Sequence, residues 1–426
     1  MKRIAILLGS LIIQSIVFGQ SDSLTLYECY AQAEKTYPLT RQNGMLEKSN
    51  ELKIKNLNKN YLPQMNLNGS ATLQSDVTEL KLNLPPQFSS IQFPQISKDM
   101  YKVTVDINQS IYDGNVTGYQ KKLESYNLQS DKENIEVELY QVKDRINQVY
   151  FSIFLYQQSE NLLNSTKEQL ESKLKEVQSA VDNGAVLASN ADAIKAELMK
   201  IDQQITETRT DRNTAFQVLS QLTSSTIPNT SNLVLPNVQV STMSLDDKRP
   251  EIQLYNIMQS KTGIMKDMVN TRWNPKFYAF GQAGYGRPGL NMLSNDFTPW
   301  WIIGAKLTWN IWNWNLSSNE KKIYDIQKDI IGTQKETFEK NLNIEASRGL
   351  AEIGKVTELL QKDEEIIALR TKIIKAASSQ LTNGVITSSD YISRLNEETQ
   401  AKLTLELHKI QLVKAKIGYL FTLGKL

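Results

Sequence analysis

The sequence predicts a mainly α-helical chain with a β-barrel portion, built from duplicated long helical hairpins and four amphipathic strands. Three observations carry this prediction. Motifs return after a fixed interval, from 111 to 311 and from 183 to 383. Strand-like segments alternate apolar and polar residues with a period of two, and helical stretches such as 115–182 contain no proline.

The repeat is visible in two motifs that lie in different parts of each half. Asn183-Gly184 between two helical runs returns as Asn383-Gly384, and Ile111-Tyr112-Asp113 at the end of a strand returns as Ile311-Trp312-Asn313. Because one motif belongs to the helices and the other to the strands, the halves repeat a whole architecture.

The predicted organisation begins with a segment that is removed. Lys2 and Arg3, an apolar run at 4–18 and then Gly19 have the layout of a secretory signal peptide, so we assign 1–19 to it. The mature chain is expected to consist of a first repeat at 20–223, a linker with two prolines at 224–248, and a second repeat at 249–426.

Composition excludes several classes of function. The chain has 48 basic and 46 acidic residues, and removal of Lys2 and Arg3 leaves 46 of each, so a nucleic-acid partner is not expected. There is one cysteine, Cys29, and one histidine, His408. They cannot form an intrachain disulfide or the usual catalytic and metal constellations, so we expect no enzyme and no cofactor, and Cys29 as a core residue of a helix.

Each half carries two strand-like segments, at about 65–74 and 101–112, and at about 276–286 and 300–312. One face of each is apolar and the other polar, which suits a barrel wall but also one sheet of a soluble sandwich. Aromatic residues gather near the strand ends, as at a lipid–water interface. The candidate membrane-interface aromatics are Trp300, Trp301, Trp309 and Trp312, with Trp314 beside them.

Very long helices are expected at 115–182 and 316–382, each followed by a returning helix. At 1.5 Å per residue the first would extend roughly 100 Å. Its apolar residues follow the alternating spacing of a coiled-coil seam. The seam consists of Ile135, Leu139, Val142, Ile146, Val149 and Ile153.

Four strands do not close a barrel, and a membrane tolerates no open sheet edge. The missing strands must therefore come from other copies of the chain. Two copies would give about eight strands, and side chains would fill the interior of such a barrel. Three copies would give about 12 strands, and the barrel would keep an open lumen. A role in transport favours three.

Taken together, the motifs resemble the TolC family of outer-membrane efflux proteins. The resemblance implies a homotrimer with one shared barrel of about 12 strands and an α-helical tunnel in the periplasm of a Gram-negative-type cell. It implies a passive exit duct in outer-membrane lipid that works with a periplasmic adaptor and an inner-membrane pump, in a tripartite efflux pump or a type I secretion system. The motifs are Leu24-Thr25-Leu26-Tyr27-Glu28-Cys29-Tyr30, Tyr37-Pro38, Tyr61-Leu62-Pro63-Gln64, Gln109-Ser110-Ile111-Tyr112-Asp113-Gly114, Arg249-Pro250-Glu251 and the two Asn-Gly tips.

Other classes of protein remain open at this stage. A periplasmic coiled-coil adaptor or a structural protein without a pore would share the long hairpins. Neither explains amphipathic strand pairs at equivalent points of both halves. The transported substrate and the pump class are not encoded in these patterns.

Two sites follow from the resemblance. The hairpin tips at 183–188 and 383–387 would dock an adaptor, although their glycines also suit plain helix caps. Asp390 would gate the periplasmic entrance as one of three carboxylates, or would only cap the returning helix. Its counterpart in the first half is Asn190. The candidate docking residues are Asn183, Gly184, Val186, Asn383, Gly384, Val385 and Ile386.

Overall fold

The computed structural model describes residues 23–77, 96–241 and 244–426, so the expected signal peptide lies outside the described residues. The chain divides into two compact units, and each takes parts of both sequence repeats. Unit 1 comprises Met1–Thr40, Leu139–Asp246 and Leu342–Leu426, and unit 2 comprises Arg41–Glu138 and Asp247–Asn341. The repeat boundaries at 20–223 and 249–426 stay a prediction.

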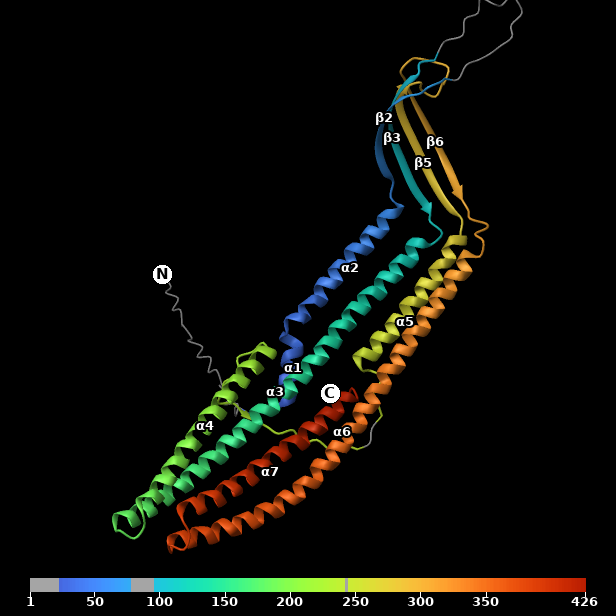
Figure 1. Cartoon of the computed structure of the whole chain (residues 1–426). Helices are drawn as coiled ribbons and strands as arrows, with labels where there is room; N and C mark the ends of the chain where they lie inside the picture. Colours follow the sequence, from blue (N-terminus) through green and yellow to red (C-terminus); the bar gives the residue numbers. More distant parts are fainter. Residues whose placement is uncertain (1–22, 78–95, 242–243) are drawn as a thin grey trace, which may run out of the picture. The chain divides into compact units, whose positions relative to one another are not determined.

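Unit 2 contains a four-stranded antiparallel sheet in the order β2-β3-β5-β6 (Figure 1). The four amphipathic strands of the predicted fold class are therefore confirmed. Their bounds are β2 Gln64–Leu73, β3 Asp99–Tyr112, β5 Lys276–Arg287 and β6 Thr298–Thr308.

The strand register separates the two faces of this sheet. Leu67, Val105 and Ala283 are aligned across three strands on the apolar face, where much of the surface is exposed. On the polar face, Asn68 of β2 and Gln282 of β5 both donate to the Asp106 carboxylate of β3. These contacts hold three strands together through side chains as well as through the backbone ladder.

The structure differs from the sequence prediction at the end of β6. We expected this strand to continue to about 312, but it ends at Thr308, which pairs with Lys276 at the start of β5. Pro275 precedes Lys276 and has no N–H to donate, so Trp309 and Trp312 have no neighbouring strand to extend the ladder. Both lie in the connection to the next helix.

Trp300 also lies elsewhere than expected. Its side chain is only 8% exposed and covers Gly284 on the neighbouring strand, where an added Cβ would come within 2.5 Å of the indole. The Lys102 ammonium lies 4.5 Å from its ring centroid. Trp300 is therefore on the polar face of the sheet, and Trp301 is exposed on the apolar face.

The helices of unit 2 pack pairwise. Ion pairs join α2 (Gln42–Asn58) to α3 (Val116–Asp182), including Lys132 with Glu47 at 2.5 Å. α5 (Pro250–Met268) pairs with α6 (Leu316–Thr382) through Lys266 and Asp325 at 2.6 Å. Among the helices in the described part of the chain, none is both long and apolar enough to span a bilayer.

Unit 1 contains the two helical hairpins, which lie side by side in Figure 1. The later part of α3 turns back as α4 (Ala188–Leu222), and the later part of α6 turns back as α7 (Ser388–Thr422). Corresponding bounds differ by 200 residues, as from 182 to 382. The duplicated hairpins predicted from the sequence are confirmed.

A buried cluster in unit 1 anchors the start of the described chain. β1 (Ser23–Leu24) pairs in parallel with β4 (Asn232–Leu233), and α1 (Leu26–Thr36) follows with a capping box at Thr25. Cys29 of α1 is 1% exposed in this cluster, which confirms it as a core residue. Burial raises the pKa of its thiol to about 12, so the thiol is inert at neutral pH.

Tyr150 of α3 holds the two short strands of this cluster. Its hydroxyl lies 2.8 Å from the Leu24 carbonyl and 2.7 Å from the Val234 carbonyl, and it accepts the Val234 N–H at 3.1 Å. We expect Tyr150→Phe to lower the free energy of unfolding by about 1–2 kcal/mol, because the Val234 N–H and the two carbonyls lose a buried partner. Chemical unfolding followed by circular dichroism measures this, with Tyr27→Phe, at an exposed ring, as the control. Equal midpoints for the two variants would contradict the assignment.

Candidate functional site at the hairpin tips

The two hairpin tips in unit 1 share one turn geometry. Gly184 and Gly384 have φ angles of 72° and 71°, the left-handed region that glycine adopts without strain. In each turn the glycine N–H and the next N–H bond back to helix carbonyls, a Schellman ending. The Asn183 side chain donates to Ser179 O at 2.7 Å, and Asn383 donates to Ser379 O at 2.8 Å. The interpretation of both glycines as helix caps is confirmed.

Apolar residues at the tips are only partly exposed. A docking role for the tips predicts that the side chains of Val186, Leu187, Val385 and Ile386 are exposed when no partner covers them. Leu187 and Val385 are exposed, whereas Val186 and Ile386 are partly buried against the apolar cluster between the hairpins. The docking role of these residues stays a prediction, and Leu187 and Val385 are the apolar side chains that a partner could cover.

Asp390 lies in the first turn of α7 and forms a capping box with Thr387. The Thr387 N–H donates to the Asp390 carboxylate at 3.0 Å, and the Asp390 N–H donates to the Thr387 hydroxyl at 3.2 Å. The Thr387 hydroxyl and then its backbone N–H lower the pKa of Asp390 below its ordinary value. The capping interpretation is confirmed, and the exposed carboxylate also leaves the gating role possible as a prediction.

Polar contacts link the first hairpin to the second. The Asn190 side chain of α4 accepts the Ser388 N–H at the start of α7 at 2.9 Å, so one hairpin caps a helix of the other. Further from the tip, Asn396 donates to Glu197 at 2.9 Å. From the sequence, Asn190 is a counterpart of Asp390 and one of the residues that cap the first returning helix, and its contact with the second hairpin was missed. Its correspondence to a helix-capping position was the signal that could have found this contact.

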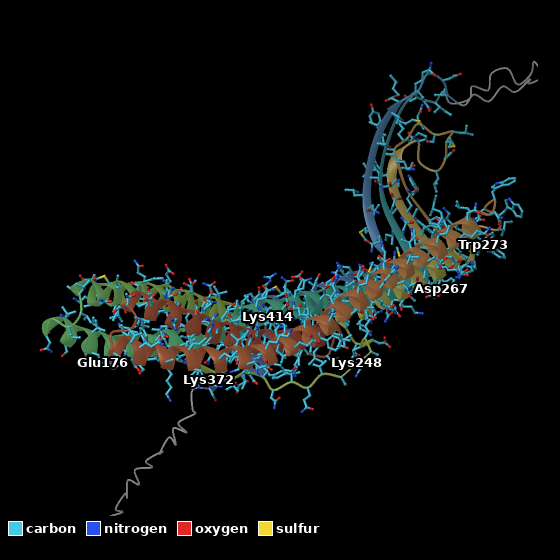
Figure 2. All side chains as sticks on the ribbon, turned by 60° about the horizontal axis from the view of Figure 1, so that its bottom comes forward. Glu176, Lys248, Asp267, Trp273, Lys372 and Lys414 are labelled. Atoms are coloured by element: carbon cyan, nitrogen blue, oxygen red, sulfur yellow. The ribbon has the colours of Figure 1, made fainter. Side chains whose placement is uncertain are left out.

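A buried lysine lies beside the tips. Lys173 of α3 is 7% exposed, and its ammonium lies 2.6 Å from Glu176 and 3.4 Å from the Thr382 hydroxyl at the end of α6. Glu176 is labelled near this end of the hairpins in Figure 2. Both tips also line a cavity of about 770 Å³. Its lining includes Lys173, Val186, Asn190, Leu381, Ile386 and Ser388.

Solved structures of known proteins share this architecture, whereas comparisons of sequence find no match. No family model and no curated protein matches the sequence. The CmeC outer-membrane channel of Campylobacter jejuni is similar over 94% of this chain and 85% of its own, with a TM-score of 0.64 and 14% identity. The MtrE outer-membrane channel of Neisseria gonorrhoeae, in its open state, matches over 94% and 88%, with a TM-score of 0.65 and 14% identity. The outer-membrane protein VceC of Vibrio cholerae matches over 94% and 96%, with a TM-score of 0.65 and 11% identity.

The chain has the TolC-type outer-membrane channel fold. The four strands of unit 2 carry an exposed apolar face. Trp301 of β6 is exposed, as are Trp309 and Trp312 of the connection that follows it, and Trp300 is buried on the polar face. The membrane-interface role of all four stays a prediction.

Within the described residues, no group of three or more histidine, cysteine, aspartate or glutamate side chains is placed to hold a metal ion. His408 is half-buried, and its Nδ1 lies 2.5 Å from the Asp363 carboxylate on the other helix of the second hairpin.

The capping box at the start of α7 can be tested by removing the Asp390 carboxylate. We expect Asp390→Ala to speed hydrogen exchange of the amides at the start of α7 severalfold, because the Thr387 N–H loses the Asp390 carboxylate as its acceptor and half of the capping box is removed. The pKa of Asp390 is lowered in the fold, so the contribution is present above the ordinary value of 3.8 and is lost as pH falls through the folded value. Exchange at neutral pH measured by mass spectrometry is the test. Asp192→Ala, at an exposed acid that pairs with Lys195 in α4, is the control, and an equal effect there would refute the cap.

Proposed function

We propose that this chain is a passive exit duct of the outer membrane, assembled as a homotrimer around one shared barrel of about 12 strands. The observation that carries the proposal is the sheet of unit 2. It has two open edges and an apolar face that the described residues leave exposed. The channels with the same fold lend further support.

The edges favour assembly with copies of the same chain. Among the described strands, β2 pairs only with β3, and β6 pairs only with β5. In lipid each unpaired backbone group costs several kcal/mol, so β6 of one copy needs a strand such as β2 of the next. Head-to-tail pairing of this kind forms a closed ring when the rotation between copies closes.

The outer helices of unit 2 carry matching apolar stripes. Met45 and Leu52 of α2 are seven residues apart, so they share one helix face, and both are exposed. Ile323, Ile326 and Ile330 of α6 form a second exposed stripe at helical spacing. We infer that the α6 stripe of one copy packs on the α2 stripe of its neighbour, which continues the pairing of β6 with β2.

The hairpin tips are the proposed contact with a periplasmic adaptor. Leu187 and Val385 are exposed apolar side chains beside a cavity that both hairpins line. An inner-membrane pump would pass cargo through the adaptor, either in a tripartite efflux pump or in a type I secretion system. A duct of this kind moves cargo without enzymatic chemistry.

Asp390 is the proposed charge at the periplasmic entrance. Threefold symmetry would bring three carboxylates around one axis, which favours cations. The contact between Asn190 and Ser388 would hold the neighbouring hairpin beside this turn in the closed entrance. Cap and gate use the same side chain, because Asp390 bonds Thr387 and keeps its charge exposed.

The trimer is tested at the α6 stripe. We expect Ile326→Glu to abolish the trimer, because 59% of this residue is exposed in the chain and would be buried between copies. Native mass measurement in detergent reports the assembly, circular dichroism reports the fold, and planar bilayers report conductance. Lys328→Glu, an exposed change on another face of the same helix, should leave the trimer intact. A stable monomer of the unchanged chain with folded strands would refute the proposal.

The entrance charge is tested with a variant that keeps a capping side chain. We expect Asp390→Asn to raise the concentration of trivalent cation needed for half-block from the periplasmic side by roughly tenfold, because three charges leave one ring. Single-channel recording gives both the block and the cation preference. Asp192→Asn, an exposed acid on the first hairpin, is the matched control. If block and preference do not change, Asp390 is a cap and the gate lies elsewhere.

A further inference from the structure

The polar face of the sheet in unit 2 carries more positive than negative charge. The register aligns Asp106 of β3 with Gln282 of β5, and Gln282 with Ile302 of β6. Side chains alternate between the faces of a strand, so every second residue from these three lies on the polar face. The charged residues that share this face with Asp106 are Lys102 of β3, Lys276 of β5 and Lys306 of β6. Three lysines against one aspartate leave a surplus of positive charge on the described strands.

The acids of the sheet do not pair with these lysines. Asp99 and Arg287, at one end of the strands, form an ion pair with each other. The Asp106 carboxylate accepts hydrogen bonds from three neighbouring polar side chains. In the described part of the chain, none of the three lysines has an acid within ion-pair distance. A neighbouring copy of the same sheet would add the same surplus of positive charge.

Two aromatic rings of the polar face pack against the sheet. The Trp300 indole covers Gly284, and the Lys102 ammonium lies 4.5 Å from the centroid of this ring. The ring is neutral, so it positions Lys102 without cancelling its charge. Phe280 covers Gly304 in the same way, because an added Cβ there would come within 2.6 Å of the ring. Both rings lie over glycines, so they leave the space above the sheet to the lysine side chains.

The three lysines lie near the two ends of the strands. Lys276 is the first residue of β5, and Lys306 pairs with Tyr278 close to that end. Lys102 pairs with Gly286 near the other end of β5. The path from Tyr278 to Gly286 is about 27 Å at about 3.4 Å per residue. A barrel built from this sheet would therefore have two separate bands of positive charge.

Like charges at neighbouring positions of a sheet cost stability unless something neutralises them. Lys276 and Lys306 occupy diagonal positions on adjacent strands, which lie about 7–8 Å apart. Lys306 is exposed, and an anion in the space above the sheet would offset this repulsion. Rings of lysine or arginine are the arrangement that favours anions in pores. The charge pattern of the polar face therefore indicates an anion path.

We propose that the polar face of the sheet makes the barrel lumen selective for small organic anions, with Lys306 as the main specificity-determining residue. This inference rests on the proposed function, because the polar face lines a lumen only if the strands close into a barrel. The ammonium groups attract the carboxylate, sulfonate or phosphate groups of such a cargo. Lys306 is exposed and forms no ion pair or ring contact with the described residues, so its charge is available to the cargo. Lys102 supplies the second band.

Single-channel recording in planar bilayers under a gradient of potassium chloride tests the role of Lys306. The reversal potential gives the ratio of chloride to potassium permeability. We expect Lys306→Gln to lower this ratio roughly threefold and Lys306→Glu to lower it further, because three charges are removed or reversed in one ring. Lys306→Arg keeps the charge at the same position and is the matched control, so its ratio should not change. Native mass measurement in detergent reports whether each variant is a trimer.

Citrate, an organic anion with three carboxylates, tests the class of cargo. We expect citrate added on the side of the strands to reduce the chloride current of the unchanged trimer, because it competes for the same lysines. The concentration for half-block should rise roughly threefold in Lys306→Gln and in Lys102→Gln, since each variant removes one ring of charge. Asp390→Asn should leave citrate block unchanged, because Asp390 belongs to unit 1 and not to the strands.

The possible outcomes separate this inference from the proposed function. If the unchanged trimer conducts but Lys306→Gln and Lys306→Glu change neither the permeability ratio nor citrate block, the anion path is overturned and the channel stands. If Lys306→Arg alters the ratio as much as Lys306→Gln, the side chain acts through its shape, and selection by charge is overturned. If Lys306→Gln no longer forms a trimer, Lys306 joins the copies, and its lining role is overturned. If the unchanged chain does not conduct, the proposed channel fails, and the anion path fails with it.

Discussion

Among the described residues, the sheet of unit 2 has an uncovered apolar face and two unpaired hydrogen-bonding edges, and most other features of the chain follow from that constraint. A soluble sheet would cover such a face with a second layer, and native sheets rarely leave long open edges. Here Leu67, Trp301 and Ile303 stay exposed in the described structure. The proposed lipid and neighbouring copies satisfy both demands together, and the stripes on α2 and α6 extend the same requirement to the helices. The polar network around Asp106 belongs to the opposite face, where contact with water is tolerable.

The two hairpins are similar in length and turn geometry, but their tips differ in detail. Both tips keep the Asn-Gly ending, because the left-handed turn is a local backbone requirement. The returning helices begin differently. α7 has the capping box of Thr387 and Asp390, whereas α4 follows Leu187, which forms no side-chain cap. Asn190 of α4 instead reaches the start of α7. Asn190 and Asp390 occupy equivalent positions, but Asp390 caps its own helix whereas Asn190 contacts the other hairpin. This contact is a reason to expect the two hairpins to move together at the proposed entrance.

The junctions between strand and helix also differ between the repeats. Gly114 has a φ angle of 73°, and an added Cβ would lie 3.0 Å from the Asn274 Cβ, so a side chain at this position would be strained and crowded. Trp314 has open surroundings and keeps the same left-handed conformation at an energetic cost. Equivalent backbone positions thus serve packing in one repeat and an exposed aromatic surface in the other.

Local periodicity and turn chemistry determined much of this fold from the sequence alone. Helices at 115–182 and 316–382 were predicted within one residue of α3 and α6, because their seams and the Asn-Gly endings act over a few neighbouring residues. The alternation of the strands determined their two faces, and applied strictly it also separates Trp300 from its neighbour Trp301. The tertiary structure alone decided where β6 ends, because that depends on the partner residues of β5 and on Pro275. It alone decided that Asn190 meets Ser388 and that Lys173 is buried beside Thr382, since these contacts join segments about 200 residues apart, beyond the reach of any local pattern.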